Sequence, residues 1–525
     1  MIPADMTSRG NIAEAGRLLD WKPVSAVCFG LLTVIVGSHG FMRPTYLNAD
    51  PDIMYVYEAL LINGGQSQDY FDHTGYLYIL LLSVWTRLLH ILGLVGPFRL
   101  QEFAAMPADA FEAAYHQLVV AGRWLSLIIA GGFIVLLVTT VRRLSGSPLV
   151  AAVAALLFAV SPGVVTPALI LRPEMLTALF AFASFASLAE AARASGVRMP
   201  VLLALAAFLA MAAMMTKVQV VPVLLALPVL AIAFGHHHPK VSFPWHRAEG
   251  VWLVLVAALG AAAFGMPALT MIFARAFLHG WPIYQAAIVL GVIVAIGVYA
   301  QVYRIDGRTA VIAGASVLAG WSAAQYLHLI TNEIQNSSVV ASFIEHMRNF
   351  ASVPGGDTAK SNLNGVLAKA LLASSVEPFQ PESVRVFPLR VAFWLALPAA
   401  AYLLYVRRYR AACQGALLVG LAYAVEVYCT LRSWNPQYYI FATPWLITGV
   451  VVMAAAIGER LAPGWRTLRY RHLLVGALVA AIGWTAVHST LLAFETRRWQ
   501  DEKNICGQKT SYLHRLPNAF AKSCS

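Results

Sequence analysis

Charged side chains are scarce in this sequence. Asp, Glu, Lys and Arg make up 12% of its 525 residues, whereas hydrophobic residues make up 59%. Soluble domains contain roughly 25% charged and roughly 45–50% apolar residues. The composition therefore excludes an ordinary soluble domain.

Long apolar runs account for the missing charge. Examples are WLSLIIAGGFIVLLVTT at 124–140 and HLLVGALVAAIGWTAV at 472–487. A hydrocarbon core about 30 Å thick requires roughly 20 apolar residues in a helix. About 12–14 runs are long enough by this measure. The sequence therefore predicts an all-α fold, a polytopic bundle of transmembrane helices.

Cysteine is also rare, with five residues in the chain. Cys28, Cys413 and Cys429 lie in or beside apolar runs, where cysteine behaves as a small hydrophobic residue. Cys506 and Cys524 bracket a polar segment and could form a disulfide if that segment faces an oxidising compartment. The sequence contains no CxxC pattern, so we predict no metal site and no cofactor, although a divalent metal stays possible.

The net charge of +12 does not indicate nucleic-acid binding. Lys and Arg gather instead in short loops such as 407–410 and 466–471. This bias is typical of cytoplasmic loops in membrane proteins. If these loops are cytoplasmic, the segments 329–385 and 431–439 lie on the external side.

These runs and loops predict the organisation of the chain. No external segment is long enough for a separate catalytic domain, so any chemistry must use loops and helix ends. The predicted parts are a cytoplasmic N-terminus (1–23) followed by an uncleaved anchor helix, a transmembrane module (24–328) with an external loop (43–75), an external loop (329–385), C-terminal transmembrane helices (386–491) and a polar tail (492–525).

The segment NADPDIMYVYEALLINGG (48–65) follows the first apolar run. Asp50 is suited to cap a helix, Pro51 to begin it and Gly64 to end it. The helix between them is about 20 Å long, too short to span, and its apolar residues recur at helical spacing. We predict an amphipathic helix at the membrane interface. Asp52 either complements the helix dipole or is a functional carboxylate facing a cleft.

A second polar cluster precedes the next apolar run. Asp72 is suited to cap that helix. His73 is harder to explain, because a cation at a helix start opposes the helix dipole. A bound anion would reconcile the two.

Further charges lie between or within apolar runs. Arg172 and Glu174 separate two runs, Lys217 lies in the middle of the run 200–235, and Arg432 follows another. A charge at the bilayer centre costs roughly 2.5–3.5 kcal/mol, so such residues usually line a functional cavity. The simpler alternatives are an Arg172–Glu174 pair and a Lys217 side chain that extends to the interface. The run 200–235 forms either one tilted helix or two short ones.

The order of these motifs resembles the GT-C superfamily of polyprenyl-phosphate-sugar glycosyltransferases. It is most similar to the branch of protein O-mannosyltransferases and the lipid A aminoarabinose transferase. The motifs are PD near the start of a short helix, then GG, DHTG, RPE, TK and NPQYY. The resemblance covers roughly residues 24–235 and, weakly, 386–457.

The resemblance implies roles for these residues. Asp52 takes the place of the catalytic base, and Asp50 is the substitute because Ile53 stands where a second acid is common. The donor phosphate would contact His73, Arg172, Lys217 and Arg432. The donor and acceptor pocket would include Asp72, Glu174, Tyr438 and Tyr439.

The implied reaction moves a sugar from a polyprenyl phosphate to an acceptor hydroxyl, with inversion. A phosphate leaving group needs cations and no general acid, and one carboxylate suffices as general base. The acceptor stays open among lipid, glycan and protein. The short loops favour a bacterial inner membrane, with the site facing the periplasm. The alternatives are a secondary transporter, a lipid-linked glycan polymerase or ligase, and a non-catalytic assembly factor.

Overall fold

The protein is described by a computed structural model. The described residues are 20–38, 40–42, 51–66, 68, 75–104, 106–235, 281–334, 387–430, 436–461, 483, 484 and 487. Several predictions lie outside these residues: the apolar runs 251–273 and most of 473–491, almost all of the loop 329–385, and the pair Cys506 and Cys524.

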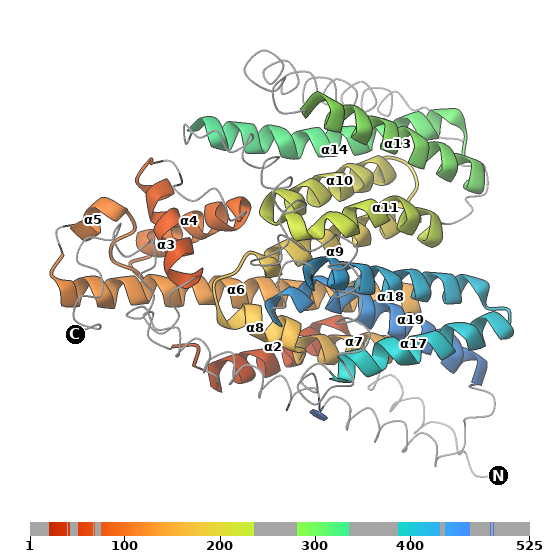
Figure 1. Ribbon diagram of the computed structural model, residues 1–525, viewed down its shortest axis with the longest axis horizontal. Coiled ribbons are helices and arrows are strands. Elements are labelled where there is room, and N and C mark those ends of the chain that lie inside the picture. Colours follow the sequence, from red (N-terminus) through yellow and green to blue (C-terminus); the bar gives the residue numbers. More distant parts are fainter. Residues whose placement is uncertain are drawn as a thin grey trace, which may run out of the picture.

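Every regular element in the described residues is a helix, which confirms the predicted fold class (Figure 1). The α-helices are α2 (Trp21–Ser38), α3 (Pro51–Asn63), α4 (Tyr76–Ile91), α5 (Leu100–Ala104), α6 (Ala108–Ser145), α7 (Pro148–Ala159), α8 (Pro162–Leu169), α9 (Glu174–Ala191), α10 (Arg198–Thr216), α11 (Val221–Phe234), α13 (Trp281–Tyr303), α14 (Gly307–Ile334), α17 (Phe387–Tyr405), α18 (Tyr409–Thr430) and α19 (Thr443–Leu461). Two short 3-10 helices are η2 (Val218–Val220) and η7 (Pro436–Phe441).

Five helices in the described part are long and apolar enough to cross a membrane. They are α2, α6, α9, α10 and α18, and the bent pair α7–α8, with 51° between its two parts, would be a sixth. The length and apolar composition of these helices therefore indicate a membrane protein. The predicted 12–14 spans remain a prediction.

Helix α6 is the longest described element, with 38 residues. At 1.5 Å per residue it measures about 57 Å, nearly twice the thickness of a bilayer core. The helix is therefore longer than a single span requires, and its first turns lie beside α3, α4 and α5 (Figure 1). Residues 108–121 are part of α6 and do not form a separate helix.

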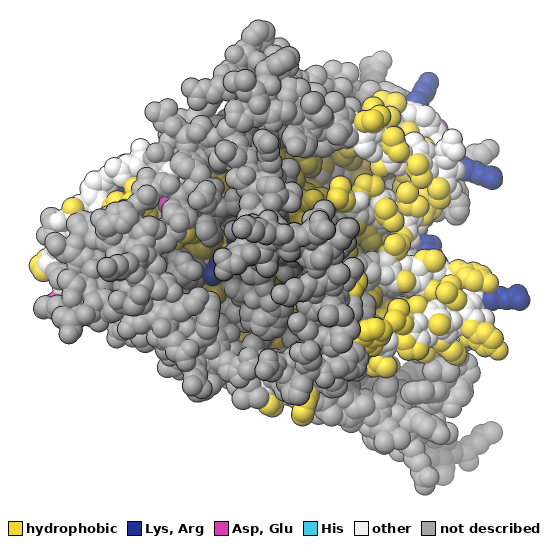
Figure 2. All heavy atoms as spheres, in the orientation of Figure 1, with side chains coloured by type: hydrophobic (Ala, Val, Ile, Leu, Met, Phe, Trp, Pro, Cys, Tyr) yellow, Lys and Arg dark blue, Asp and Glu magenta, His cyan; other side chains and the backbone are white. Residues whose placement is uncertain are grey.

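Basic side chains mark one end of the bundle, which we call the basic end. Arg143 and Arg198 both pair with Glu190, joining the end of α6, the end of α9 and the start of α10. Arg410 donates to the Gly235 carbonyl, joining α18 to the end of α11. Figure 2 shows Lys and Arg side chains gathered along this edge, at the right of the view. The structure thus places these loops together, as the positive-inside rule requires.

Helix α3 begins and ends where Pro51 and Gly64 predict. Its predicted amphipathic character is wrong, because every residue from Asp52 to Leu61 is buried. The helix packs against α4, α5 and α6. Tyr115 of α6 donates a hydrogen bond to the Ile53 carbonyl at 2.7 Å. Protein therefore surrounds the carboxylates of α3.

The 3-10 helix η7 packs closely on α8. A Cβ atom on Gly163 would lie 2.7 Å from Thr443 Oγ1 and 2.9 Å from the Ile440 nitrogen. The second contact is to backbone, which cannot rotate away. Only glycine lets α8 approach η7 this closely.

We therefore expect Gly163→Ala to lower the thermal unfolding temperature in detergent, since overpacking costs about 1–3 kcal/mol. Gly132→Ala is the matched control, because a Cβ there meets nothing within 4 Å. Fluorescence-detected size-exclusion after heating measures both variants. Equal melting of the two variants would contradict this packing.

The arrangement of charges also predicts an orientation. In a background without native cysteines, Ala110→Cys reports the start of α6 and Ser195→Cys reports the basic end; both positions are exposed. A membrane-impermeant maleimide should label Ala110→Cys in intact cells and Ser195→Cys in inverted vesicles only. Labelling of both from one side would break the helix order described here, and the reverse pattern would invert the protein.

Candidate functional site

Charged side chains are buried at the end of the bundle opposite the basic end. They come from the start of α3, the middle of α6, the start of α9 and the break between α10 and α11. Helices α3, α8 and α9 all pack against α6 (Figure 1). Two ion pairs organise them.

The first pair joins Asp52 of α3 to Arg123 of α6. Arg123 Nε and Nη2 both donate to Asp52 Oδ2, at 3.1 and 2.8 Å. The Leu171 backbone N–H donates to Oδ1 at 2.8 Å, and Arg123 Nη1 donates to the Phe41 carbonyl at 2.7 Å. Asp52 is 0% and Arg123 1% exposed. Hydrogen bonds thus compensate for burying both charges.

The second pair joins Glu174 to Lys217. Lys217 Nζ lies 3.4 Å from Glu174 Oε1, with the two residues 4% and 0% exposed. Neither Glu174 oxygen accepts a hydrogen bond within the described structure. A carboxylate accepts up to about four hydrogen bonds, so this one has capacity for a ligand.

The second pair forms at a point where the helical chain is interrupted. Helix α10 ends at Thr216, Lys217 is extended (φ −159°, ψ 128°), and the chain resumes in η2 and α11. The run 200–235 therefore forms two helices. Lys217 does not extend to the interface, and Glu174 pairs with Lys217 in preference to the expected Arg172. Both simpler alternatives for these residues were wrong.

Tyr78 lies near both ion pairs, and its ring packs on that of Tyr55. The rings of Tyr55 and Tyr78 meet edge to face at 5.5 Å, and the Tyr78 hydroxyl lies 2.9 Å from Ser126 Oγ on α6. A Cβ on Gly75 would lie 3.1 Å from Tyr55 Cε1 and 3.7 Å from Pro173. Gly75 is the last residue of the DHTG motif, and Pro173 is the middle residue of the RPE motif. The segment just before α4 therefore lies against the turn at 170–173.

Several predicted residues therefore share one region. Asp52 binds the backbone three residues before Glu174, and Arg172, half-buried, lies between them in sequence. Tyr438 is half-buried and Tyr439 buried in η7, which packs on α8 and α9. Asp50, Asp72, His73 and Arg432 lie outside the described residues, so their roles stay predictions.

Arg123 is the functional candidate that sequence reasoning missed. A signal was present, because Arg123 is the only Asp, Glu, Lys or Arg between Glu112 and Arg142. A lone cation in such a run needs a buried partner. The partner, Asp52, is 71 residues away in the sequence, which no local pattern reveals.

The described residues contain no group of three or more His, Cys, Asp or Glu able to hold a metal. The described cysteines Cys28, Cys413 and Cys429 are free. No protein-family model, curated protein or solved structure matches the chain. The chemistry of the site must therefore be argued from its own residues.

The first ion pair makes a prediction about stability. Arg123→Met leaves the Asp52 carboxylate buried without its partner and should destabilise the protein by about 3–5 kcal/mol. Adding Asp52→Asn removes that charge, so the double variant should melt at a higher temperature than Arg123→Met alone. Thermal unfolding in detergent of both single variants and the double variant measures the coupling. Additive losses would show that the pair contributes no interaction of its own.

Proposed function

We propose that this protein is a membrane glycosyltransferase that moves a sugar from a polyprenyl-phosphate donor to an acceptor hydroxyl. The observation that carries the proposal is the buried Glu174–Lys217 pair, whose carboxylate oxygens accept no hydrogen bond in the described structure. It lies beside Asp52 and Arg172, away from the basic end. The resemblance to the GT-C superfamily supports the same reaction.

The proposed step is a displacement at the anomeric carbon. The acceptor oxygen forms the new bond, the bond from carbon to phosphate oxygen breaks, and its electron pair leaves with the phosphate. Lys217 and Arg172, with His73 and Arg432 outside the described residues, are the proposed cations for that phosphate. The acceptor proton passes to a carboxylate. Attack from the face opposite the phosphate inverts the anomeric centre.

Asp52 remains our proposed base, and its contacts set a geometric condition. Of about four positions at which a carboxylate accepts hydrogen bonds, three are occupied by Arg123 and the Leu171 N–H. An acceptor hydroxyl must therefore approach Oδ1. Glu174, proposed for the pocket, is the alternative base because both of its oxygens are open.

Discontinuous helices also favour a second candidate, a secondary transporter. Transporters place binding sites where helices are broken near the bilayer midplane. The break at Lys217 and the bend between α7 and α8 are two such points. A lipid-linked glycan polymerase or ligase would use the same donor chemistry. The proposed location is a bacterial inner membrane with the site at the periplasmic face.

The test uses full-length protein in detergent with radiolabelled polyprenyl-phosphate sugars and crude membrane acceptors. We expect label transfer by the wild type and a loss of at least 100-fold in Asp52→Asn, since base catalysis contributes about 10²–10⁴-fold. Lys217→Met should also lose transfer, because it removes a phosphate contact. Glu190→Gln, at the far end of the helix that begins with Glu174, is the control and should retain it.

Other outcomes discriminate the alternatives. Transfer that survives in Asp52→Asn but not in Glu174→Gln would move the base to Glu174. Transfer that is unchanged in Asp52→Asn, Glu174→Gln and Lys217→Met would separate the reaction from this site. No transfer by the wild type with any donor, together with substrate flux into sealed vesicles, would establish the transporter.

A further inference from the structure

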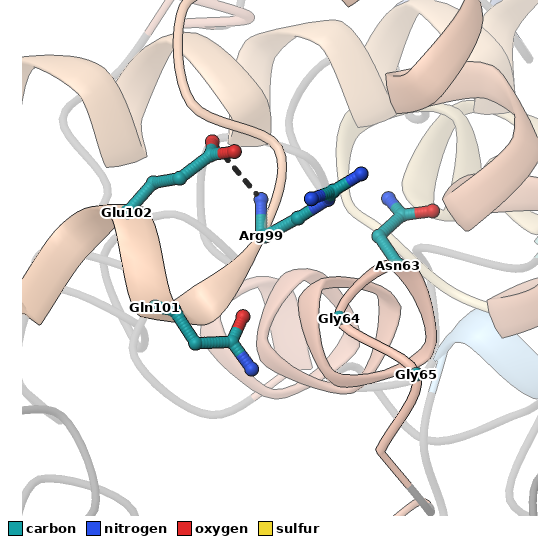
Figure 3. Close-up of a pocket in the computed structure, with 6 residues that line it drawn as sticks. All are labelled: Asn63, Gly64, Gly65, Arg99, Gln101 and Glu102. Carbon is teal, nitrogen blue, oxygen red and sulfur yellow. Dashed lines mark hydrogen bonds between the residues drawn. The ribbon is translucent and has the colours of Figure 1, made fainter.

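A polar pocket lies at the same end of the molecule, apart from the two ion pairs. Its volume is about 480 Å³, and its lining comes from the end of α3 and the start of α5 (Figure 3). The lining residues are Asn63, Gly64, Gly65, Arg99, Gln101 and Glu102. Ligand pockets measure roughly 300–1,000 Å³, so the size suits a small polar group.

The lining carries one charge of each sign and two amides. Glu102 Oε2 accepts from the Phe98 and Arg99 backbone N–H groups, at 2.8 and 3.4 Å. The Arg99 guanidinium lies 4.8 Å over the Phe98 ring, and no ion pair with a described carboxylate holds it. Figure 3 shows this guanidinium facing the amide of Asn63 across the pocket. The two charges of the pocket therefore sum to zero, although Arg99 and Glu102 form no ion pair with each other.

Exposed aliphatic side chains lie beside this pocket. Ile91, Leu92 and Leu94 are 72%, 60% and 59% exposed. The ring of His90, next to Ile91 in the sequence, stacks on Phe98 at 4.2 Å, and Arg99 lies over the same Phe98 ring. The loop that carries these aliphatic residues thus leads directly into the pocket.

The depth of this loop follows from α6. Gln117 donates to the Leu94 carbonyl at 2.8 Å. Trp124, which is 44% exposed, lies seven residues further along α6, about 10 Å by helix rise. Exposed tryptophan favours the boundary between lipid and water. With Trp124 at this boundary, the loop would lie near the lipid headgroups.

We propose that this pocket binds the headgroup of a phosphoethanolamine lipid. Arg99 would bind the phosphate, because guanidinium and phosphate oxygens match in charge and geometry. Glu102 and the amide oxygens would accept hydrogen bonds from the primary ammonium. Ile91, Leu92 and Leu94 would contact the acyl chains.

The choice of headgroup follows from the pocket's charges. A zwitterion satisfies Arg99 and Glu102 together. A phosphoglycerol headgroup offers no cation to Glu102, which would then face an anion. A phosphocholine headgroup has the cation but no N–H donors, so it cannot hydrogen-bond to the carboxylate.

The test embeds the full-length protein in nanodiscs with equal amounts of phosphatidylethanolamine, phosphatidylglycerol and phosphatidylcholine. Native mass spectrometry then counts the lipids that each protein retains. We expect at least a fivefold preference for phosphatidylethanolamine in the wild type. Arg99→Gln should lose that retention, and Glu102→Gln, which keeps the acceptor for the backbone N–H groups, should lose the preference over phosphatidylcholine. Arg87→Gln, an exposed arginine on α4 outside the pocket, should match the wild type.

A soluble competitor separates a lipid from a free headgroup. Glycerophosphoethanolamine should displace the lipid only at a large excess, because it lacks acyl chains. Displacement at equal concentration would overturn the lipid assignment and leave a site for a soluble phosphate ester. Equal retention of the three lipids by the wild type, or unchanged preference in both pocket variants, would overturn the site itself.

Discussion

The buried pair of Asp52 and Arg123 is the interaction on which the described structure of the site depends. Removing two charges from water costs several kcal/mol per ion, and only good geometry with further hydrogen bonds repays it. Here the Leu171 N–H and the Phe41 carbonyl complete the pair. The pair therefore joins four separate segments at one point: the residues after α2, the start of α3, the middle of α6 and the turn before α9. Because the turn is fixed, the start of α9 is fixed too, and Glu174 meets Lys217.

The two ion pairs differ in how fully they are satisfied, and this difference separates their roles. Asp52 is held by three donors, whereas the Glu174 oxygens accept no hydrogen bond in the described structure. Buried polar atoms without partners are uncommon in folded proteins and require a reason. A ligand that donates hydroxyl or N–H groups would supply the missing bonds. The first pair therefore positions its segments and leaves Asp52, the proposed base, one open acceptor position on Oδ1, whereas both oxygens of Glu174 are open to a substrate. This is why the two carboxylates must be tested separately.

Local chemistry in the sequence predicted the elements well and their surroundings poorly. Pro51 and Gly64-Gly65 correctly predicted the ends of α3, because the preferences of proline and glycine act within a few residues. Whether α3 lies on a surface depends on α4, α5 and α6, and its apolar spacing indicated an exposed polar face that does not exist. The charges at Arg172, Glu174 and Lys217 were found because lone charges in apolar runs are costly. The pairing of Glu174 with Lys217 was not predicted, since contacts between residues 43 positions apart are decided by tertiary packing. Arg123 was overlooked for the same reason.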